Sequence, residues 1–451
     1  MKIKLKIPFI ILVSLLFVSN LFVVLNTQVV AYDVEHFGYF DTPVKIIKWG
    51  GDQEEGSVFG KLDSHGDLVV TCYSKSFGVV GEDVYVIKYD TNYELQWNVS
   101  WATNDFARPA DLAFDANNNI YIAGTIVTQI PPGTFTHDAF LLKYAPNGTL
   151  LWDEKRHIAD QEDTVDCLTV ASNDIIYVAG TTNNSNGFLF IQKYDSSGSY
   201  KTTYYHGETA PKELVFPGDL QIDSSGNIFI GGSTNNTPGV NYQDLVLIKL
   251  DSNGDLVWNT SYGGTNPADY GNDMILFNGA VYVIGGLGPE ISLPGTNNDT
   301  LLVKFNATTG EIIWNVTWDL DNDFGKAIDI NRHGNPVIVS TCDYMNGTDY
   351  IAVAEFLPNG TLLWDISYRS EYSDRVSDIS VESGLLYSIG SRYNATSDYD
   401  IYIVVYQDHT FTNFPTQGPY GVIFGTIIGI ILGFFAITVI LGLIYTYWKK
   451  S

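Results

Sequence analysis

A repeated unit of four short β-type runs takes up most of this chain and constrains its fold more than any other feature. The unit is clearest at residues 219–264, where tight polar turns (DSSG, DSNG) and one longer loop separate the runs DLQID, NIFIGG, DLVLIKL and DLVWNTSY. Apolar residues alternate along the runs, and Ser-Gly and Asn-Gly pairs mark the hairpins. Because one unit cannot cover both faces of its own sheet, the chain must fold as an array of neighbouring units.

The number of runs predicts that the array closes into a ring. If the runs are called A to D, the chain holds seven sets of A, B and C but only six D runs behind them. A tryptophan, or a threonine in one unit, marks each D run: Trp97, Trp152, Thr202, Trp258, Trp314 and Trp364. The missing D run stands in front, since VKIIKWGG at 44–51 resembles the end of the D run in the unit at 219–264.

A chain that opens on a D run and ends on a C run completes its last sheet with its own beginning. A ring of four-stranded blades needs this arrangement to leave no free edge, whereas a solenoid does not. We therefore predict an all-β fold, a seven-bladed β-propeller over residues 44–406, closed by an N-terminal outer strand.

The segments NIYIAGT, NIFIGGST, DAFLLKYAPNGTLLW and DLVLIKLDSNGDLVWNTSYGG resemble the seven-bladed β-propeller repeat (SBBP) family. The resemblance covers about residues 44–406, and it is weakest in the third and sixth blades. It implies the propeller fold. It implies no activity, because members of this family are mostly secreted or surface proteins of unassigned function.

Both ends of the chain are apolar and indicate a membrane-anchored surface protein. Residues 1–31 carry three lysines before an apolar run and form either a cleaved signal peptide or an uncleaved anchor. After a lead-in at 32–43, the propeller and a linker at 407–419, residues 420–448 contain no charge and are long enough to span a bilayer. The basic tail at 449–451 predicts a cytoplasmic C-terminus, and hence a single-pass plasma-membrane protein whose propeller is extracellular.

Glycine recurs at every fourth position of the predicted membrane helix, which allows close contact between two helices. Along one stripe, small residues let two backbones approach, and this favours a homodimer. The alternative is a monomer, since glycine is common in membrane spans. The stripe consists of Gly421, Gly425, Gly429 and Gly433.

The charge of the body excludes nucleic acid as a partner. All 51 acidic residues but only 19 of the 24 basic ones lie between the two apolar segments, which leaves a net charge of −32 there. A surface this acidic repels phosphate backbones.

Cysteines and sequons fit an exterior domain with a large core. Cys72, Cys167 and Cys342 are expected to be buried small residues, the alternative being a single disulfide. Eleven Asn-X-Ser/Thr sequons predict glycosylation: Asn98, Asn147, Asn183, Asn235, Asn259, Asn298, Asn306, Asn315, Asn346, Asn359 and Asn394.

One acidic loop is a candidate metal site. Asp319, Asp321 and Asp323 alternate before Gly325, as in loops that give oxygen ligands to calcium, although the downstream bidentate Glu of such loops is missing. The alternatives are a calcium site and a solvated acidic loop. No other cofactor is expected.

A lysine near the end of run C faces the tryptophan of run D in several units. Counting outward from the Asn-Gly turn pairs Lys249 with Trp258, and the same count pairs Lys143 with Trp152. We expect the lysine stem to lie across the indole as a structural contact, not as a ligand site.

The function is predicted from the faces of the ring. The B-to-C and D-to-A connections form one face (the loop face), which looks away from the membrane if the chain leaves the propeller at Tyr406 and enters the bilayer shortly afterwards. Its variable apolar loops favour a protein or glycan ligand. No catalytic motif is present, so we expect a non-enzymatic cell-surface protein for adhesion, recognition or envelope structure. The alternative is a surface enzyme or solute-binding receptor acting on polysaccharide or peptide at the central opening, and carboxylates converging there from several blades would favour it.

Overall fold

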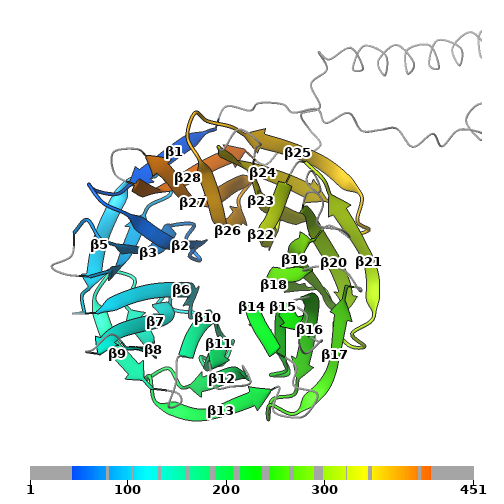
Figure 1. Cartoon of the computed structure of the whole chain (residues 1–451), viewed down its shortest axis with the longest axis horizontal. Coiled ribbons are helices and arrows are strands. Elements are labelled where there is room, and N and C mark those ends of the chain that lie inside the picture. Colours follow the sequence, from blue (N-terminus) through cyan, green and yellow to red (C-terminus); the bar gives the residue numbers. More distant parts are fainter. Residues whose placement is uncertain are drawn as a thin grey trace, which may run out of the picture. The chain divides into compact units, whose positions relative to one another are not determined.

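The computed structural model describes residues 43–407, except 78–80, 104, 131–133, 158–162, 183–187, 207–213, 236–242, 264–268, 289–297, 321, 344–347 and 395–397. These residues form a ring of seven antiparallel four-stranded sheets, the blades (Figure 1). The predicted all-β seven-bladed propeller is therefore confirmed. In each blade, strand A lies innermost and strand D outermost, next to the ring's outer edge.

The strands of blades 1 to 4 have the following bounds. Blade 1 contains β2 (Glu55–Leu62), β3 (Leu68–Ser74), β4 (Asp83–Tyr89) and β5 (Leu95–Trp101). Blade 2 contains β6 (Phe106–Phe114), β7 (Ile120–Ile130), β8 (Thr134–Tyr144) and β9 (Leu150–Arg156). Blade 3 contains β10 (Asp163–Val170), β11 (Ile176–Thr182), β12 (Phe188–Tyr194) and β13 (Tyr200–His206). Blade 4 contains β14 (Leu214–Ile222), β15 (Ile228–Asn235), β16 (Asp244–Leu250) and β17 (Leu256–Tyr262).

Blades 5 to 7 complete the ring. Blade 5 contains β18 (Tyr270–Phe277), β19 (Ala280–Leu287), β20 (Asp299–Asn306) and β21 (Ile312–Trp318). Blade 6 contains β22 (Asn322–Ile330), β23 (Pro336–Asp343), β24 (Asp349–Phe356) and β25 (Leu362–Tyr368). Blade 7 contains β26 (Asp374–Glu382), β27 (Leu385–Asn394), β28 (Asp398–Gln407) and β1 (Lys45–Trp49).

The first strand closes the ring as the run count predicts. Strand β1 pairs antiparallel with β28, with Lys45 opposite Val405 and Trp49 opposite Ile401. The side chain of Ile47 is buried in the apolar cluster between blades 7 and 1. The first and last strands of the propeller thus share one sheet.

The core lies between the blades. Every residue of β3 and β4 is buried, since each face of the sheet packs on a neighbouring blade. The side chains of Cys72, Cys167 and Cys342 are all buried, as expected for small core residues, and no disulfide joins any two of the three.

The lysine–tryptophan pairs have the expected register, and Lys304 lies over the Trp314 ring at 5.8 Å, but Lys143 makes a different contact. Lys143 lies opposite Trp152 and Lys249 opposite Trp258. However, the Lys143 ammonium lies over the Tyr121 ring of strand B, 4.7 Å from its centroid, and not over the indole. The indole of Trp152 instead donates to the Ser196 carbonyl of the next blade at 3.4 Å. The tryptophan therefore joins two blades.

The apolar ends of the chain lie outside the described residues, namely the predicted signal at 1–31, the linker at 407–419 beyond its first residue, and the membrane helix at 420–448. Within the described ranges, no helix has the length and apolar character needed to cross a membrane.

Candidate functional site

Seven strands A line the central opening: β2, β6, β10, β14, β18, β22 and β26 (Figure 1). Each is interrupted by a β-bulge or a comparable shift of register against its strand B. A bulge leaves one residue unpaired and re-aims side chains locally. In blades 2 to 7 the unpaired bulge residues are Ala110, Asp166, Gly218, Asn272, Lys326 and Ser377.

An aspartate directly follows the bulge residue in four blades, and in three of them it accepts a hydrogen bond from a backbone amide of the next blade. Asp111 Oδ2 accepts a hydrogen bond from the Leu168 amide of blade 3 at 3.0 Å. Asp273 Oδ2 accepts one from the Ile328 amide at 2.8 Å. The four members of this set, called the clamp aspartates below, are Asp111, Asp219, Asp273 and Asp378.

The same kind of hydrogen bond joins blades 7 and 1, where the ring closes. Asp378 Oδ2 accepts from the Gly60 amide of blade 1 at 3.1 Å, and its Oδ1 accepts from Ile379 at 2.8 Å. Asp329, two positions further along strand A of blade 6, accepts from Val381 of blade 7 at 2.7 Å. These carboxylates satisfy amides that would otherwise be buried without partners.

Lys61 supplies the positive charge among these carboxylates. Its Nζ lies 2.9 Å from Asp111 Oδ1. Burial opposes the charge of the ammonium, but the carboxylates of Asp111, Asp378 and Asp219 outweigh burial and raise the pKa of Lys61. One lysine from blade 1 therefore interacts with aspartates of three other blades.

Burial keeps several of these acids partly protonated near neutral pH. It raises the pKa of Asp378 to about 7. It does the same for Asp219, where the negative charge of Asp111 adds to the effect. The pKa of Asp273 lies well above its ordinary value because of burial and the charges of Asp219 and Asp378. Carboxylates of several blades thus interact with one another along the inner strands, but they accept hydrogen bonds from backbone amides of neighbouring blades, so they do not by themselves favour the alternative function.

Two charged residues occupy bulge positions, where the other blades have small or neutral ones. Burial raises the pKa of Asp166 in blade 3 to about 7, opposed only by a backbone hydrogen bond from Thr181. Burial lowers the pKa of Lys326 in blade 6, and the like charge of Arg375 lowers it further. Since Ala110, Gly218 and Ser377 form the same bulge without charge, the fold does not require either group.

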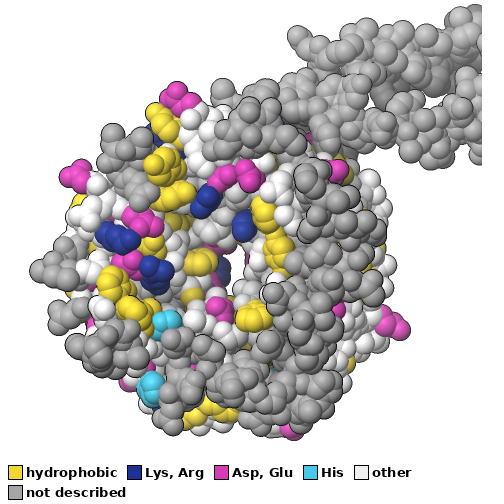
Figure 2. Space-filling view, viewed as in Figure 1, with side chains coloured by type: hydrophobic (Ala, Val, Ile, Leu, Met, Phe, Trp, Pro, Cys, Tyr) yellow, Lys and Arg dark blue, Asp and Glu magenta, His cyan; other side chains and the backbone are white. Residues whose placement is uncertain are grey.

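Aromatic and cationic side chains surround the opening on the side where strands A begin, the loop face. The position two residues before each bulge residue holds Arg108, Thr164, Phe216, Tyr270, Phe324 and Arg375 in blades 2 to 7. The rings of Tyr270 and Phe324 stack with centroids 6.5 Å apart. Figure 2 shows charged and hydrophobic side chains mixed around the hollow centre of the ring.

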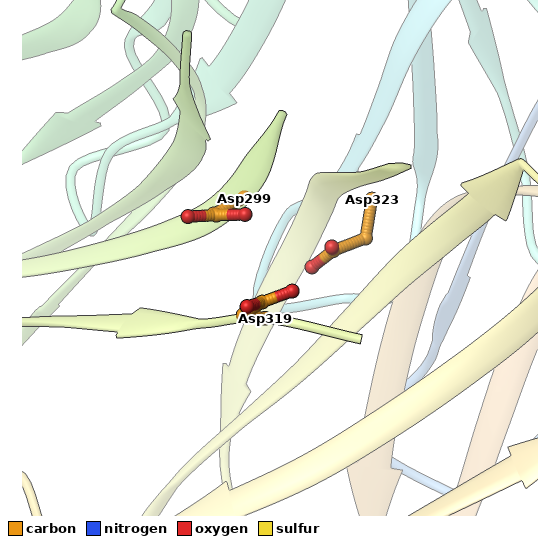
Figure 3. A group of neighbouring side chains, drawn as sticks. All are labelled: Asp299, Asp319 and Asp323. Carbon is orange, nitrogen blue, oxygen red and sulfur yellow. The ribbon is translucent and has the colours of Figure 1, made fainter. Parts of the chain in front are cut away.

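The predicted calcium loop contributes to an acidic cluster at the blade 5–6 junction. Asp319 and Asp323 come together with Asp299, and one oxygen of each lies within 4.8 Å of the others (Figure 3). Asp321 lies outside the described residues. Asp323 Oδ2 also accepts from the Thr300 amide at 3.0 Å, and burial together with Asp319 raises the pKa of Asp299.

Three carboxylates without nitrogen or sulfur donors suit a hard cation such as calcium. Asp299 belongs to a different run from the predicted loop, so spacing in the sequence did not reveal it.

The remaining predicted sites fall into three groups. Exposed sequon asparagines are Asn98, Asn147, Asn259, Asn315 and Asn359, while Asn298 and Asn306 are half-buried. The side chains of Asn183, Asn235, Asn346 and Asn394 lie outside the description. So do Gly421, Gly425, Gly429 and Gly433.

Comparison with known proteins identifies the repeat. Residues 209–239, which include β14 and β15, match the SBBP beta-propeller repeat family. The resemblance expected from the sequence is thereby confirmed. The regulatory protein FlaEY of Caulobacter vibrioides is 24% identical in an alignment of 281 positions that covers 51% of this chain. The match covers 29% of FlaEY, so the chain spans well under half the length of this curated relative.

Solved propellers show the same architecture at low identity. An ulvan lyase of polysaccharide lyase family PL25 superposes with a TM-score of 0.52 and 13% identity, covering 83% of this chain and 100% of its own. The polysaccharide lyase Uly1 superposes with a TM-score of 0.51 and 11% identity, covering 83% of this chain and 92% of its own. At these identities the likeness is one of fold.

These structures correct the expectation that the chain is not an enzyme. That expectation rested on the absence of a local catalytic motif, yet propellers of similar architecture include polysaccharide lyases. A propeller assembles a site from side chains of several blades, and a motif search along the sequence does not detect such a site.

Proposed function

We propose that this chain, a seven-bladed propeller carrying an SBBP beta-propeller repeat, binds a polysaccharide at its central opening, on the loop face, and cleaves it by acid–base chemistry. The observation that carries the proposal is the placement of Asp166 and Lys326 at bulge positions of strands that line the opening. Charged residues that a scaffold does not need are candidates for function.

The chemistry follows from protonation. A carboxyl group with a pKa of about 7 is half protonated at neutral pH, so Asp166 is suited to donate or accept a proton at a sugar oxygen or carbon. The amine of Lys326, whose pKa burial lowers, is suited to stabilise negative charge that develops during cleavage or to take part in proton transfer. The clamp aspartates are assigned to the scaffold.

The fold likeness to polysaccharide lyases supports the substrate class only as far as fold allows. The aromatic residues Phe216, Tyr270 and Phe324 on three successive blades add support from this chain itself. Apolar surfaces with a few charged groups between them are typical of small-molecule and sugar subsites.

An activity assay with matched variants tests the proposal. The full-length chain in detergent micelles is incubated with a panel of neutral and acidic polysaccharides, and new chain ends are counted. Asp166→Asn should lower the rate by about 100-fold or more, the usual contribution of an acid–base group. The equivalent bulge variant Ser377→Ala should keep the wild-type rate.

Two results would count against the function. One is that wild type binds and cleaves no polysaccharide of the panel. The other is that Asp166→Asn and Ser377→Ala both cleave polysaccharide at the wild-type rate.

The proposal extends to location. The uncharged run at 420–448, followed by Lys449 and Lys450, supports a C-terminal plasma-membrane anchor. The acidic, sequon-rich body would then meet its polysaccharide outside the cell.

A further inference from the structure

Lys326 is unusual among the cations near the central opening, because it has no carboxylate partner among the described residues. Arg108 pairs with Glu82, Arg375 with Asp349, and the buried Arg392 with Asp374. By contrast, the Lys326 ammonium lies 5.6 Å from the centroid of the Phe324 ring. The neighbouring charge that acts on Lys326 is that of another cation, Arg375, which helps to lower the pKa of Lys326.

Such an arrangement is unexpected in this chain. The protein contains 51 acidic residues and only 24 basic ones, so acidic neighbours are common in this chain. A half-buried lysine beside an arginine is therefore unexpected, because both the partial burial and the like charge disfavour its ammonium form. The bulge itself does not need the lysine, since Asn272 fills the equivalent place in the neighbouring blade. An anion supplied from outside would resolve the conflict by pairing with both cations.

The surroundings indicate what carries the anion. Phe324 stacks on Tyr270 of the preceding blade at 6.5 Å and 24°, giving a half-buried apolar surface next to the ammonium. Phe216, one blade further round, is 43% exposed. A ligand that fits both features has an apolar ring face and an acidic substituent, as an acidic sugar does.

We propose that Lys326 and Arg375 bind the carboxylate or sulfate group of an acidic sugar whose ring lies against Phe324. This inference rests on the proposed function and narrows its substrate to anionic polysaccharide. Lys326 provides a charge that no carboxylate neutralises within the described part of the chain, while Arg375, held by Asp349 at 2.7 Å, adds directed N–H donors.

Binding of defined oligosaccharides to the full-length chain in micelles tests the inference, with calorimetry as the readout. The probes are an oligogalacturonate for carboxylate, a sulfated galactan oligosaccharide for sulfate, and cellohexaose as the neutral chain. Wild type should bind at least one acidic probe about tenfold or more tightly than cellohexaose.

The variants separate charge from shape. Lys326→Met should weaken the acidic probe about tenfold and leave cellohexaose unchanged, while Lys326→Arg should retain most of the acidic binding. Phe324→Ala should weaken both kinds of probe. Lys45→Met, at an exposed lysine on the outer strand β1, is the matched control and should bind as wild type. Thermal melts confirm that each variant is folded.

Every outcome bears on the proposal. Selective binding of the carboxylated or of the sulfated probe supports it and identifies the group. Equal affinity for neutral and acidic probes, or wild-type acidic binding by Lys326→Met, overturns it but leaves polysaccharide binding intact. Failure to bind any sugar overturns the proposed function together with this inference.

Discussion

Single buried carboxyl groups on the inner strands affect how the stability of this ring responds to pH. Carboxyl groups of Asp166, Asp219 and Asp378 have pKa values of about 7, raised by burial. An unfolded chain releases these protons near pH 4. Between about pH 4 and pH 7 the folded state therefore holds more protons than the unfolded state, and these groups make the protein less stable as pH rises.

The first prediction isolates one of these groups. The free energy of unfolding of wild type relative to Asp166→Asn should fall as pH rises from about 4 to about 7 and then level off, because the amide does not titrate. Urea unfolding of both proteins in the same buffer series measures the difference. A difference independent of pH would show that Asp166 ionises as freely in the fold as in the unfolded chain.

The second prediction concerns the acidic cluster of Asp299, Asp319 and Asp323. If it binds calcium with the 10⁻⁴–10⁻³ M affinity of many extracellular modules, about 10 mM calcium stabilises the propeller by about 1.4–2.7 kcal/mol. The melting temperature of wild type should rise accordingly, and that of Asp319→Asn should not. Asp52→Asn, which changes an exposed aspartate elsewhere, should respond as wild type. An equal rise in all three proteins would point to general charge screening.

At the scale of strands, ring closure depends on a short element. Strand β1 contributes five paired residues to blade 7, and Ile47 is its buried side chain. Burial of such a side chain alone is worth about 1.5–3 kcal/mol.

The third prediction follows from this strand. Deleting residues 32–50 should lower the melting temperature by more than the loss of Ile47 alone implies, because the edge of β28 is also exposed. Deleting residues 32–42, which leaves β1 in place, is the control and should have little effect. If both deletions melt alike, β1 does not hold the ring closed.

The strands also show how far sequence reasoning reaches. Counting outward from the Asn-Gly turn gave the correct pairing of Lys249 with Trp258, because the turn is local, although it did not predict the register shift between Lys249 and Leu250. The contact of Lys143 with Tyr121 was not predicted, since Tyr121 lies on strand B, outside the C–D hairpin from which the register was counted.

The individual residues that line the opening were not predicted, for a related reason. The aspartates of DLAF, DLQI, DMIL and DISV recur at one place in strand A and were visible in the sequence. Their partners, such as Gly60 for Asp378, lie in the next blade and as far as the opposite end of the chain. Asp166 and Lys326 are recognised as unusual only when the seven strands A are compared at their bulge positions, because the equivalent residues of the other blades are uncharged.

At the scale of the whole molecule, the fourth prediction concerns association through the membrane helix. Replacing Gly425 and Gly429 by Ile should abolish cross-linked dimers in membranes and leave the melting temperature of the propeller unchanged. Ile427→Leu, on the other side of the predicted helix, is the control and should still dimerise. A wild type that remains monomeric under the same cross-linking would remove any role of the glycine stripe in association.

Ring closure has a consequence for biosynthesis. Strand β1 is made early, but its partner Val405 follows Lys45 by about 360 residues. At about 5–20 residues per second, the nascent strand waits roughly 20–70 s before β28 exists. During that time its edge is open to pairing with other chains, which is a hazard for exposed strands. Chaperones that cover extended segments are therefore expected to matter more for this protein's yield than for its stability once folded.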